Sequence, residues 1–234
     1  MNPLPRDAVI VRRLGVLDYG TVWAAMRHFT DTRDADSADE LWLVEHPPVY
    51  TVGQRGGPHG HQVPPQGPLG IPLVHSDRGG DITYHGPGQL VAYTLIDLRR
   101  RALGIRALVQ LLEQCAMGLL GSYGLRGERR AGAPGVYVGD AKIAQLGLRV
   151  RSGGSYHGLS FNVAMDLTPF AHIDPCGYRG LAVTDLRRLL PAGHDEGRLY
   201  TDVRERLTQL LTTALGYNSV RAETGLPPPG GGPA

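Results

Sequence analysis

Apolar residues recur with a helical period in three segments of the chain. In the first of these segments, Val22, Met26 and Phe29 fall on one face. Spacings of three and four residues place side chains together along a helix. The pattern therefore predicts three amphipathic helices, over 19–32, 105–120 and 199–215.

Strand-like runs occupy the middle of the chain, between the first and the last of these helices. They are short, rich in β-branched and aromatic residues, and separated by hairpin-like spacings. We place strands at 41–46, 49–53, 81–85, 89–96, 135–138, 142–150 and 156–163. This order differs from a strict alternation of strand and helix. The fold class is therefore predicted as α/β (α+β), with a mixed, largely antiparallel central sheet flanked by helices.

The length of 234 residues and the 41% hydrophobic content favour a single domain with a core of its own. We assign residues 1–222 to that domain. The last segment, ETGLPPPGGGPA (223–234), is a Pro/Gly-rich tail that we expect to be disordered. A second Gly- and Pro-rich stretch, 53–70, predicts a long loop, of the kind that often serves as a lid or binding loop.

Charge and cysteine content exclude several classes of protein. The net charge of +2, from 24 basic and 22 acidic residues, does not favour nucleic-acid binding. Two cysteines make no disulfide framework. No apolar run is long enough for a signal peptide or a membrane span. We expect a monomeric, cytoplasmic protein that binds neither nucleic acid nor membrane.

Basic residues gather in two places, Arg99–Arg101 and the group Arg126, Arg129 and Arg130. Such clusters are usually solvated faces. The alternative is a docking patch for an acidic partner protein.

Two residues stand out as candidates for chemistry. Lys142 is the only lysine, and every other basic residue among the 24 is arginine. Cys176 lies between Pro175 and Gly177, a context that predicts a turn. Either feature has an ordinary explanation, an arginine-biased composition or an incidental loop thiol. Cys115, by contrast, falls on the apolar stripe of the second helix and is interpreted as a buried small hydrophobe.

A lysine beside a cysteine would explain both features at once. A thiol with a pKa of about 8.5 is only a few per cent ionised at neutral pH, and a neighbouring cation favours the thiolate. In a sheltered site a lysine can also lose its proton, so it could accept the thiol proton and return one later. Arginine keeps its charge and cannot exchange protons in this way.

A glycine-rich run, RGGDITYHGPGQLVAY (78–93), offers a binding surface for such a pair. Its glycines allow a backbone to approach a ligand closely, although GPG between two strands is also an ordinary turn. It fits neither a phosphate-binding loop nor a dinucleotide fingerprint. His85 within it is a second candidate base, ranked below Lys142. His59 and His61 lack the further ligands that a metal site needs, so no metal is expected.

These stretches resemble the octanoyltransferases of lipoate biosynthesis, also called the lipoate-protein ligase B family. The matching motifs are HPPVYTVGQR (46–55), RGGDITYHGPGQLVAY (78–93), GVYVGDAKIAQLGLRV (135–150), HGLSFNV (157–163) and IDPCG (173–177). The resemblance runs from about residue 41 to 190. It implies the fold shared by lipoate-protein ligases and the catalytic domain of biotin protein ligases.

The resemblance also implies an activity without cofactors. An octanoyl group would move from octanoyl-acyl carrier protein to a lysine of a lipoyl domain, through a thioester on Cys176 with Lys142 as acid/base. The acceptors would be the acyltransferase subunits of 2-oxoacid dehydrogenases and the glycine-cleavage H protein. By motif, the substrate-binding residues would be Arg78, Gly79, Gly80, Asp81, Ile82, Thr83, Tyr84, His85, Gln145, Leu146, Gly147, Gly158, Leu159 and Ser160. The family pattern leads us to expect alanine at position 160.

Other activities fit parts of this pattern. An ATP-dependent ligase on the same fold would not need an acyl-cysteine. A cysteine thioesterase or hydrolase would release the fatty acid to water. A non-catalytic module would bind acyl carrier protein without forming a covalent adduct.

Overall fold

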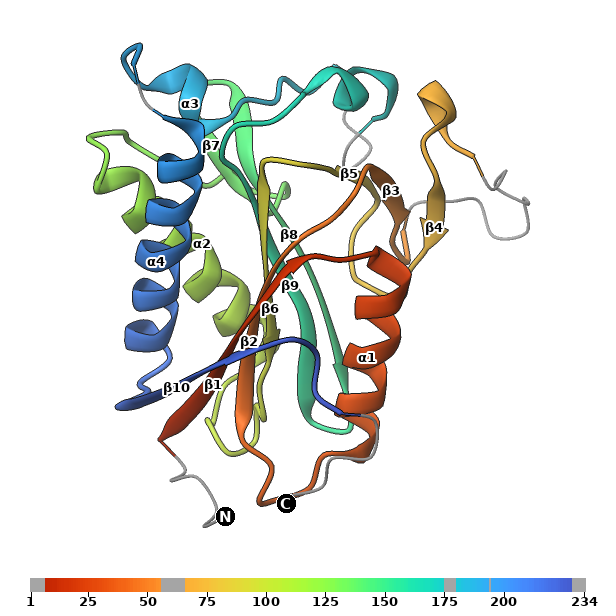
Figure 1. Ribbon diagram of the computed structural model, residues 1–234, viewed down its shortest axis with the longest axis vertical. Helices are drawn as coiled ribbons and strands as arrows, with labels where there is room; N and C mark the ends of the chain where they lie inside the picture. Colours follow the sequence, from red (N-terminus) through yellow and green to blue (C-terminus); the bar gives the residue numbers. More distant parts are fainter. Residues whose placement is uncertain (1–6, 56–65, 175–179, 194, 229–234) are drawn as a thin grey trace.

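A computed structural model describes residues 7–55, 66–174, 180–193 and 195–228 (Figure 1). Seven strands form the main sheet, in the order β10-β1-β2-β6-β9-β8-β7. Their bounds are β1 Ala8–Val16, β2 Asp39–Glu45, β6 Gln89–Leu95, β7 Val136–Val138, β8 Ala141–Arg151, β9 Gly154–Asn162 and β10 Ser219–Thr224. β1 runs parallel to β2 and β10, and the other pairs are antiparallel. The predicted mixed, largely antiparallel sheet is confirmed.

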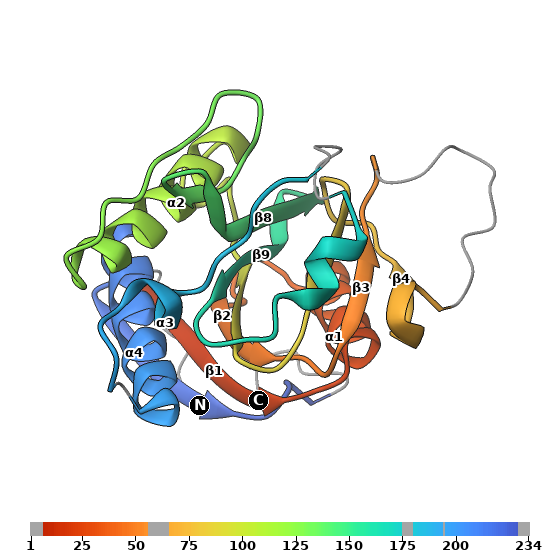
Figure 2. The same ribbon diagram turned by 90° about the horizontal axis from the view of Figure 1, so that it is seen from above.

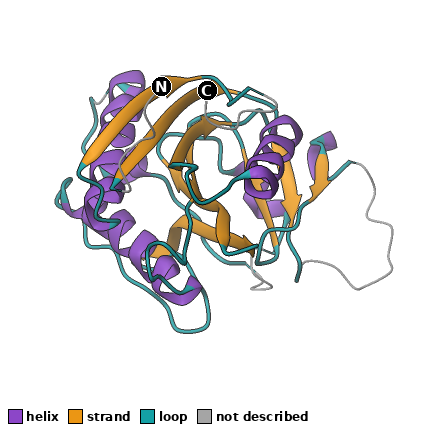
Figure 3. Ribbon diagram, turned by 90° about the horizontal axis from the view of Figure 1, so that it is seen from below, coloured by secondary structure: helices purple, strands orange, loops and turns teal. Residues whose placement is uncertain are grey.

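Helices cover both faces of this sheet, as the views from above and from below show (Figures 2 and 3). α1 (Tyr19–Thr32) lies on one face, whereas α2 (Ile105–Gly121) and α4 (Glu196–Ala214) pack side by side on the other. All three coincide closely with the predicted helices. Short helical turns complete the fold: η1 (Pro68–Gly70), η2 (Thr168–His172) and α3 (Leu186–Leu189).

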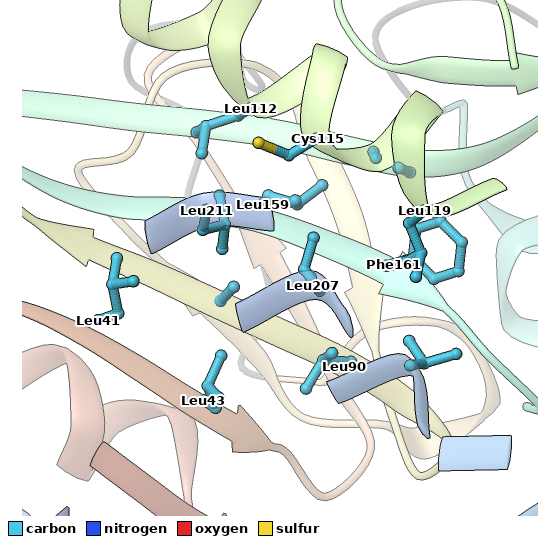
Figure 4. Packing of buried hydrophobic residues seen from close by; sticks show 14 of the residues in the cluster. Leu41, Leu43, Leu90, Leu112, Cys115, Leu119, Leu159, Phe161, Leu207 and Leu211 are labelled. Carbon is cyan, nitrogen blue, oxygen red and sulfur yellow. The ribbon is translucent and has the colours of Figure 1, made fainter. Parts of the chain in front are cut away.

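The larger core lies between the sheet and the pair α2 and α4 (Figure 4). Leucines of both helices, among them Leu112 and Leu207, meet Leu159 and Phe161 of β9. Cys115 of α2 lies among them and is 4% exposed, which confirms its interpretation as a buried apolar side chain. Burial raises the pKa of its thiol to about 11.

Two predicted strands belong to a separate, smaller sheet rather than to the central one. This sheet has the order β4-β3-β5, with bounds β3 Val49–Val52, β4 Leu73–His75 and β5 Ile82–His85. Tyr50 and Tyr84 pack with Phe170 of η2 in a small core of their own. The small sheet lies beside the start of α1 (Figure 1). The strands themselves are where the sequence predicts them, but their partners are not.

The strand β10 corrects the predicted start of the tail. Glu223 and Thr224 pair with Arg12 and Arg13 of β1, so they belong to the sheet. Arg12 explains the pairing, because its buried guanidinium binds both Glu40 and Glu223. Residues 229–234 of the predicted tail lie outside the described residues.

The arginines at 99–101 have a structural partner. Asp39 is buried and forms ion pairs with Arg33, Arg100 and Arg101, and it accepts a hydrogen bond from Tyr217. Burial raises the pKa of Asp39, but the backbone hydrogen bond and the arginines outweigh that effect and hold its pKa below the ordinary value. Two of the three clustered arginines therefore stabilise the fold.

Candidate active site

A pocket lies where β5, β8 and β9 meet the start of α1. Ligand pockets are typically lined by apolar side chains with a small number of well-placed polar groups. Lys142 of β8 lines it, together with apolar and aromatic side chains that include Val91, Tyr93 and Leu159. The walls are thus largely apolar, with a few polar groups among them.

Lys142 is 1% exposed, which is rare for a lysine. Its Nζ donates to the carbonyl oxygen of Pro134 at 2.8 Å and lies 5.5 Å from the centre of the Tyr137 ring. Gly135 leaves the space that this side chain occupies. A Cβ at Gly135, where φ is +140°, would lie 2.4 Å from Lys142 Cε.

The main chain of Lys142 is fixed by a segment from later in the sequence. Its N–H donates to the carbonyl of Ala182 at 2.8 Å, and its carbonyl accepts from Thr184 N–H at 2.9 Å. This segment follows directly after residues 175–179, which lie outside the described residues together with Cys176.

The wall formed by residues 78–80 is held by close contacts between backbones. Gly79 N–H donates to the Leu148 carbonyl at 2.9 Å. A Cβ at Gly147 would lie 2.9 Å from the Gly79 carbonyl oxygen, so only glycine admits this approach. The buried Arg78 donates to the carbonyls of Thr51 and Asp81, which ties the wall to the small sheet.

His85 makes structural contacts on both ring nitrogens, with Gln89 at Nδ1 and Thr51 at Nε2. Burial lowers its pKa to about 3. The nearby His46 is bound by Leu17 and Tyr93 in the same way, and burial lowers its pKa to about 4. Both imidazoles are therefore neutral at neutral pH, and their nitrogens are already engaged.

His157 also lines the pocket and is held by Asp77. Its Nε2 lies 2.9 Å from Asp77 Oδ1, and the same carboxylate accepts from Tyr156 and Trp23. Burial raises the pKa of Asp77, but these three hydrogen bonds outweigh it and keep the carboxylate ionised. Burial lowers the pKa of His157. His157 is not among the predicted site residues, although it begins the motif HGLSFNV.

Three polar atoms of the pocket residues are buried without a hydrogen-bond partner in the described part of the chain. They are Thr83 Oγ1, Gln145 Nε2 and His157 Nδ1. The other such side-chain atoms among the described residues are all guanidinium nitrogens. Buried polar groups are normally paired, so these three atoms are available for hydrogen bonds to a group that enters the pocket.

Comparisons with known proteins assign the chain to a family. Residues 18–212 match the lipoyl protein ligase A/B catalytic domain. The chain belongs to this family. An octanoyltransferase of Aromatoleum aromaticum is 55% identical over 217 residues, covering 84% of this chain and 92% of its own. An octanoyltransferase of Azoarcus sp. is 60% identical, covering 87% and 88%. The resemblance seen in the sequence motifs is confirmed.

Solved structures agree with the fold that the family implies. A lipoate-protein ligase A bound with ATP gives a TM-score of 0.68 at 16% identity, covering 91% of this chain and 88% of its own. A biotin protein ligase from Aquifex aeolicus with biotin and ATP gives 0.50 at 12% identity, covering 91% and 73%.

Most of the residues that the family motifs select do line the pocket. These are Lys142, Arg78, Gly80, Asp81, Ile82, Thr83, His85, Gln145, Leu146, Gly147, Gly158, Leu159 and Ser160. Gly79 fastens the wall to β8, whereas Tyr84 packs on Phe170 in the neighbouring core. Tyr19, Val91, Tyr93 and His157 also line the pocket but are not among the predicted substrate-binding residues, although the last three lie within the matching motifs.

Other sequence hypotheses have different outcomes. His59 and His61 lie outside the described residues. Within the described ranges, histidine, cysteine and acidic residues form no group of three or more that could hold a metal. No helix in the described part is both long and apolar enough to cross a membrane.

Proposed function

We propose that the chain transfers an octanoyl group from octanoyl-acyl carrier protein to a lysine of a lipoyl domain, with Cys176 carrying the group and Lys142 exchanging the protons. The relatives named octanoyltransferase support the acyl group and the type of reaction. The observation that carries the mechanism is the buried Lys142 in a largely apolar pocket. The main chain of Lys142 is hydrogen-bonded to that of Ala182, which follows Cys176 by six positions in the sequence.

In the first half of the reaction, Lys142 in its neutral form takes the proton of the Cys176 thiol. The thiolate attacks the carbonyl carbon of the thioester, and the C=O bond becomes a C–O⁻ bond. When this intermediate collapses, the carrier sulfur leaves and receives the proton from Lys142. The octanoyl group is then bound to Cys176 as a thioester, and the charges balance.

In the second half, the ε-amine of the lipoyl-domain lysine attacks the same carbonyl carbon. Lys142 takes one amine proton as the new C–N bond forms, and the Cys176 sulfur leaves as a thiolate that recovers this proton. The acyl group arrives already activated as a thioester. The acceptors we propose are lipoyl domains of 2-oxoacid dehydrogenases and of the glycine-cleavage H protein.

Intact mass measurement tests the covalent step directly. The full chain is incubated with octanoyl-acyl carrier protein and its mass is recorded. We expect one added octanoyl group in the wild type and in Cys115→Ala, and none in Cys176→Ala. The Cys115 variant is the matched control, because that thiol is buried in the α2 core. An adduct that survives in Cys176→Ala contradicts the proposal.

Variants at Lys142 test the proton exchange. Lys142→Arg keeps the positive charge and cannot exchange a proton under ordinary conditions, and Lys142→Met keeps the length of the side chain without the charge. We expect both to lose most transfer while they still unfold cooperatively in urea. Near-wild-type turnover in either folded variant contradicts the acid/base role.

Product analysis separates this activity from its rivals. A thioesterase would release octanoate at the same rate with or without a lipoyl domain. An ATP-dependent ligase would use free octanoate and ATP, and would remain active in Cys176→Ser. A binding module would hold the carrier protein without any covalent adduct.

A further inference from the structure

A pair of polar side chains crosses from β8 to β9 at the pocket. Gln145 and Ser160 are direct partners in the register of these two strands. Ser160 Oγ donates a hydrogen bond to Gln145 Oε1 at 2.9 Å. Ser160 is 4% exposed and Gln145 is 8% exposed. Both line the same pocket as Lys142.

This hydrogen bond uses the oxygen of the Gln145 amide and leaves the nitrogen unused. Nε2 carries two N–H donors, and it is buried without a partner in the described part of the chain. Gln89 provides a contrast, because its buried Nε2 donates to Tyr84 O and Asn162 Oδ1. A desolvated amide nitrogen is costly unless something accepts its hydrogens, so the pocket calls for an acceptor at this point.

A carbonyl oxygen has the chemistry that fits this donor. It accepts N–H hydrogen bonds and carries no proton of its own, and an acyl thioester brings one such oxygen into an otherwise largely apolar pocket. Gln145 also lies three residues from Lys142 on the same strand. Both residues line one pocket, so the amide and the Lys142 amine border the same ligand space.

We propose that Gln145 Nε2 donates a hydrogen bond to the carbonyl oxygen of the acyl group, and that Ser160 is the positioning residue that fixes the amide in this orientation. This inference rests on the proposed function. The family pattern leads us to expect alanine at position 160, whereas this chain has serine. The hydroxyl of Ser160 binds the oxygen of the Gln145 amide and so holds the amide in place. The donation strengthens during attack, because the oxygen acquires negative charge as the C–S bond forms.

The measurement is the single-turnover rate of acylation by octanoyl-acyl carrier protein, followed by intact mass at several substrate concentrations. Gln145→Met keeps the length of the side chain but has no N–H, and we expect the saturating rate to fall about 100-fold. The half-saturating concentration should change much less. Gln145→Glu keeps an acceptor for Ser160 and loses the donor, so we expect a similar loss. Gln209→Met, on the exposed side of α4, is the matched control and should leave the rate unchanged.

Ser160 is tested by a double-mutant cycle. Ser160→Ala should slow acylation by about 10-fold, because the amide loses its orientation. In a Gln145→Met background the same change should have no further effect, since the donor it positions is gone. Independent effects at the two positions overturn the positioning role. An unchanged acylation rate in a folded Gln145→Met variant overturns the donor role.

The two proposals fail in different ways. If the wild type forms no octanoyl adduct, the proposed function fails and this inference fails with it. If the wild type is acylated and Gln145→Met is acylated equally fast, only this inference fails. A urea unfolding curve for each variant separates a loss of rate from a loss of folded protein.

Discussion

Gly135→Ala tests whether the space beside Lys142 is required. The added Cβ would lie 2.4 Å from Lys142 Cε and 2.6 Å from the carbonyl oxygen of Ala144. Carbon atoms in contact are separated by about 3.5–4.0 Å, so one of the two groups must move by about 1 Å. Alanine is also strained at the φ of +140° that Gly135 adopts.

Each of these effects can be given a magnitude. Backbone strain of this kind costs about 1–3 kcal/mol, and overpacking costs about 1–3 kcal/mol more. The sum of about 2–6 kcal/mol compares with a total stability of about 5–15 kcal/mol for a typical domain. Misplacing a reacting group by about 1 Å can lower a rate by about 100-fold. We therefore expect a destabilised protein whose remaining folded fraction transfers octanoyl about 100 times more slowly.

Gly139→Ala is the matched control at the other end of β7. Gly139 also has a positive φ, of +54°, but its Cβ would meet no atom within 4 Å. The Gly139→Ala substitution should cost only backbone strain, about 1–2 kcal/mol, and leave octanoyl transfer intact. Urea unfolding and acyl transfer per folded molecule are measured on both variants. Equal transfer by the two variants would refute the steric argument about Lys142.

Three further predictions concern stability and reactivity. Asp39→Asn should lower the free energy of unfolding by about 3–5 kcal/mol at pH 7, because buried arginines lose their partner. Since the folded pKa of Asp39 is lowered, this difference should shrink below about pH 4, and urea curves that show no such trend contradict the assignment. Burial lowers the pKa of His46 to about 4. The free energy of unfolding should therefore fall by about 1.4 kcal/mol for each unit by which the pH is lowered from about 6.5 to 4. His46→Gln should remove this part of the pH dependence. In Cys176→Ala protein, the raised pKa and burial of Cys115 should prevent reaction with a thiol reagent at pH 8 until urea unfolds the chain, and prompt labelling of the native protein would show that the core is open.

Sequence periodicity predicts the helices well because each presents one apolar face to a single core. It fails for β1, where AVIVRRLGV contains two adjacent arginines. Arg12 is buried only because Glu40 and Glu223, distant in the sequence, supply its counter-charges. It fails for β10 because that edge strand is mostly exposed and most of its residues are polar. Both failures come from partners that a local pattern does not contain.

The site was predicted to the extent that it is made of contiguous motifs. β5, β8 and β9 converge at one pocket. They bring together the run 78–85 and the triplets 145–147 and 158–160. Tyr19 and Val91 were not selected because, in sequence, each is an ordinary residue of an amphipathic helix or a buried strand. The ionised Asp77 beside His157 could not be found at all, since their contact spans 80 positions.

The glycine contacts in the pocket walls limit how this site can vary in evolution. At Gly147 and Gly158 a single added methyl group would collide with a neighbouring backbone, at 2.9 Å and 2.1 Å. With the acyl chain in this pocket, as proposed, lineages that accept longer or shorter chains would have to resize the cavity elsewhere, at lining positions such as Val91 and Ile82. Divergence in chain-length preference is expected to accumulate at those two positions while the glycines stay fixed.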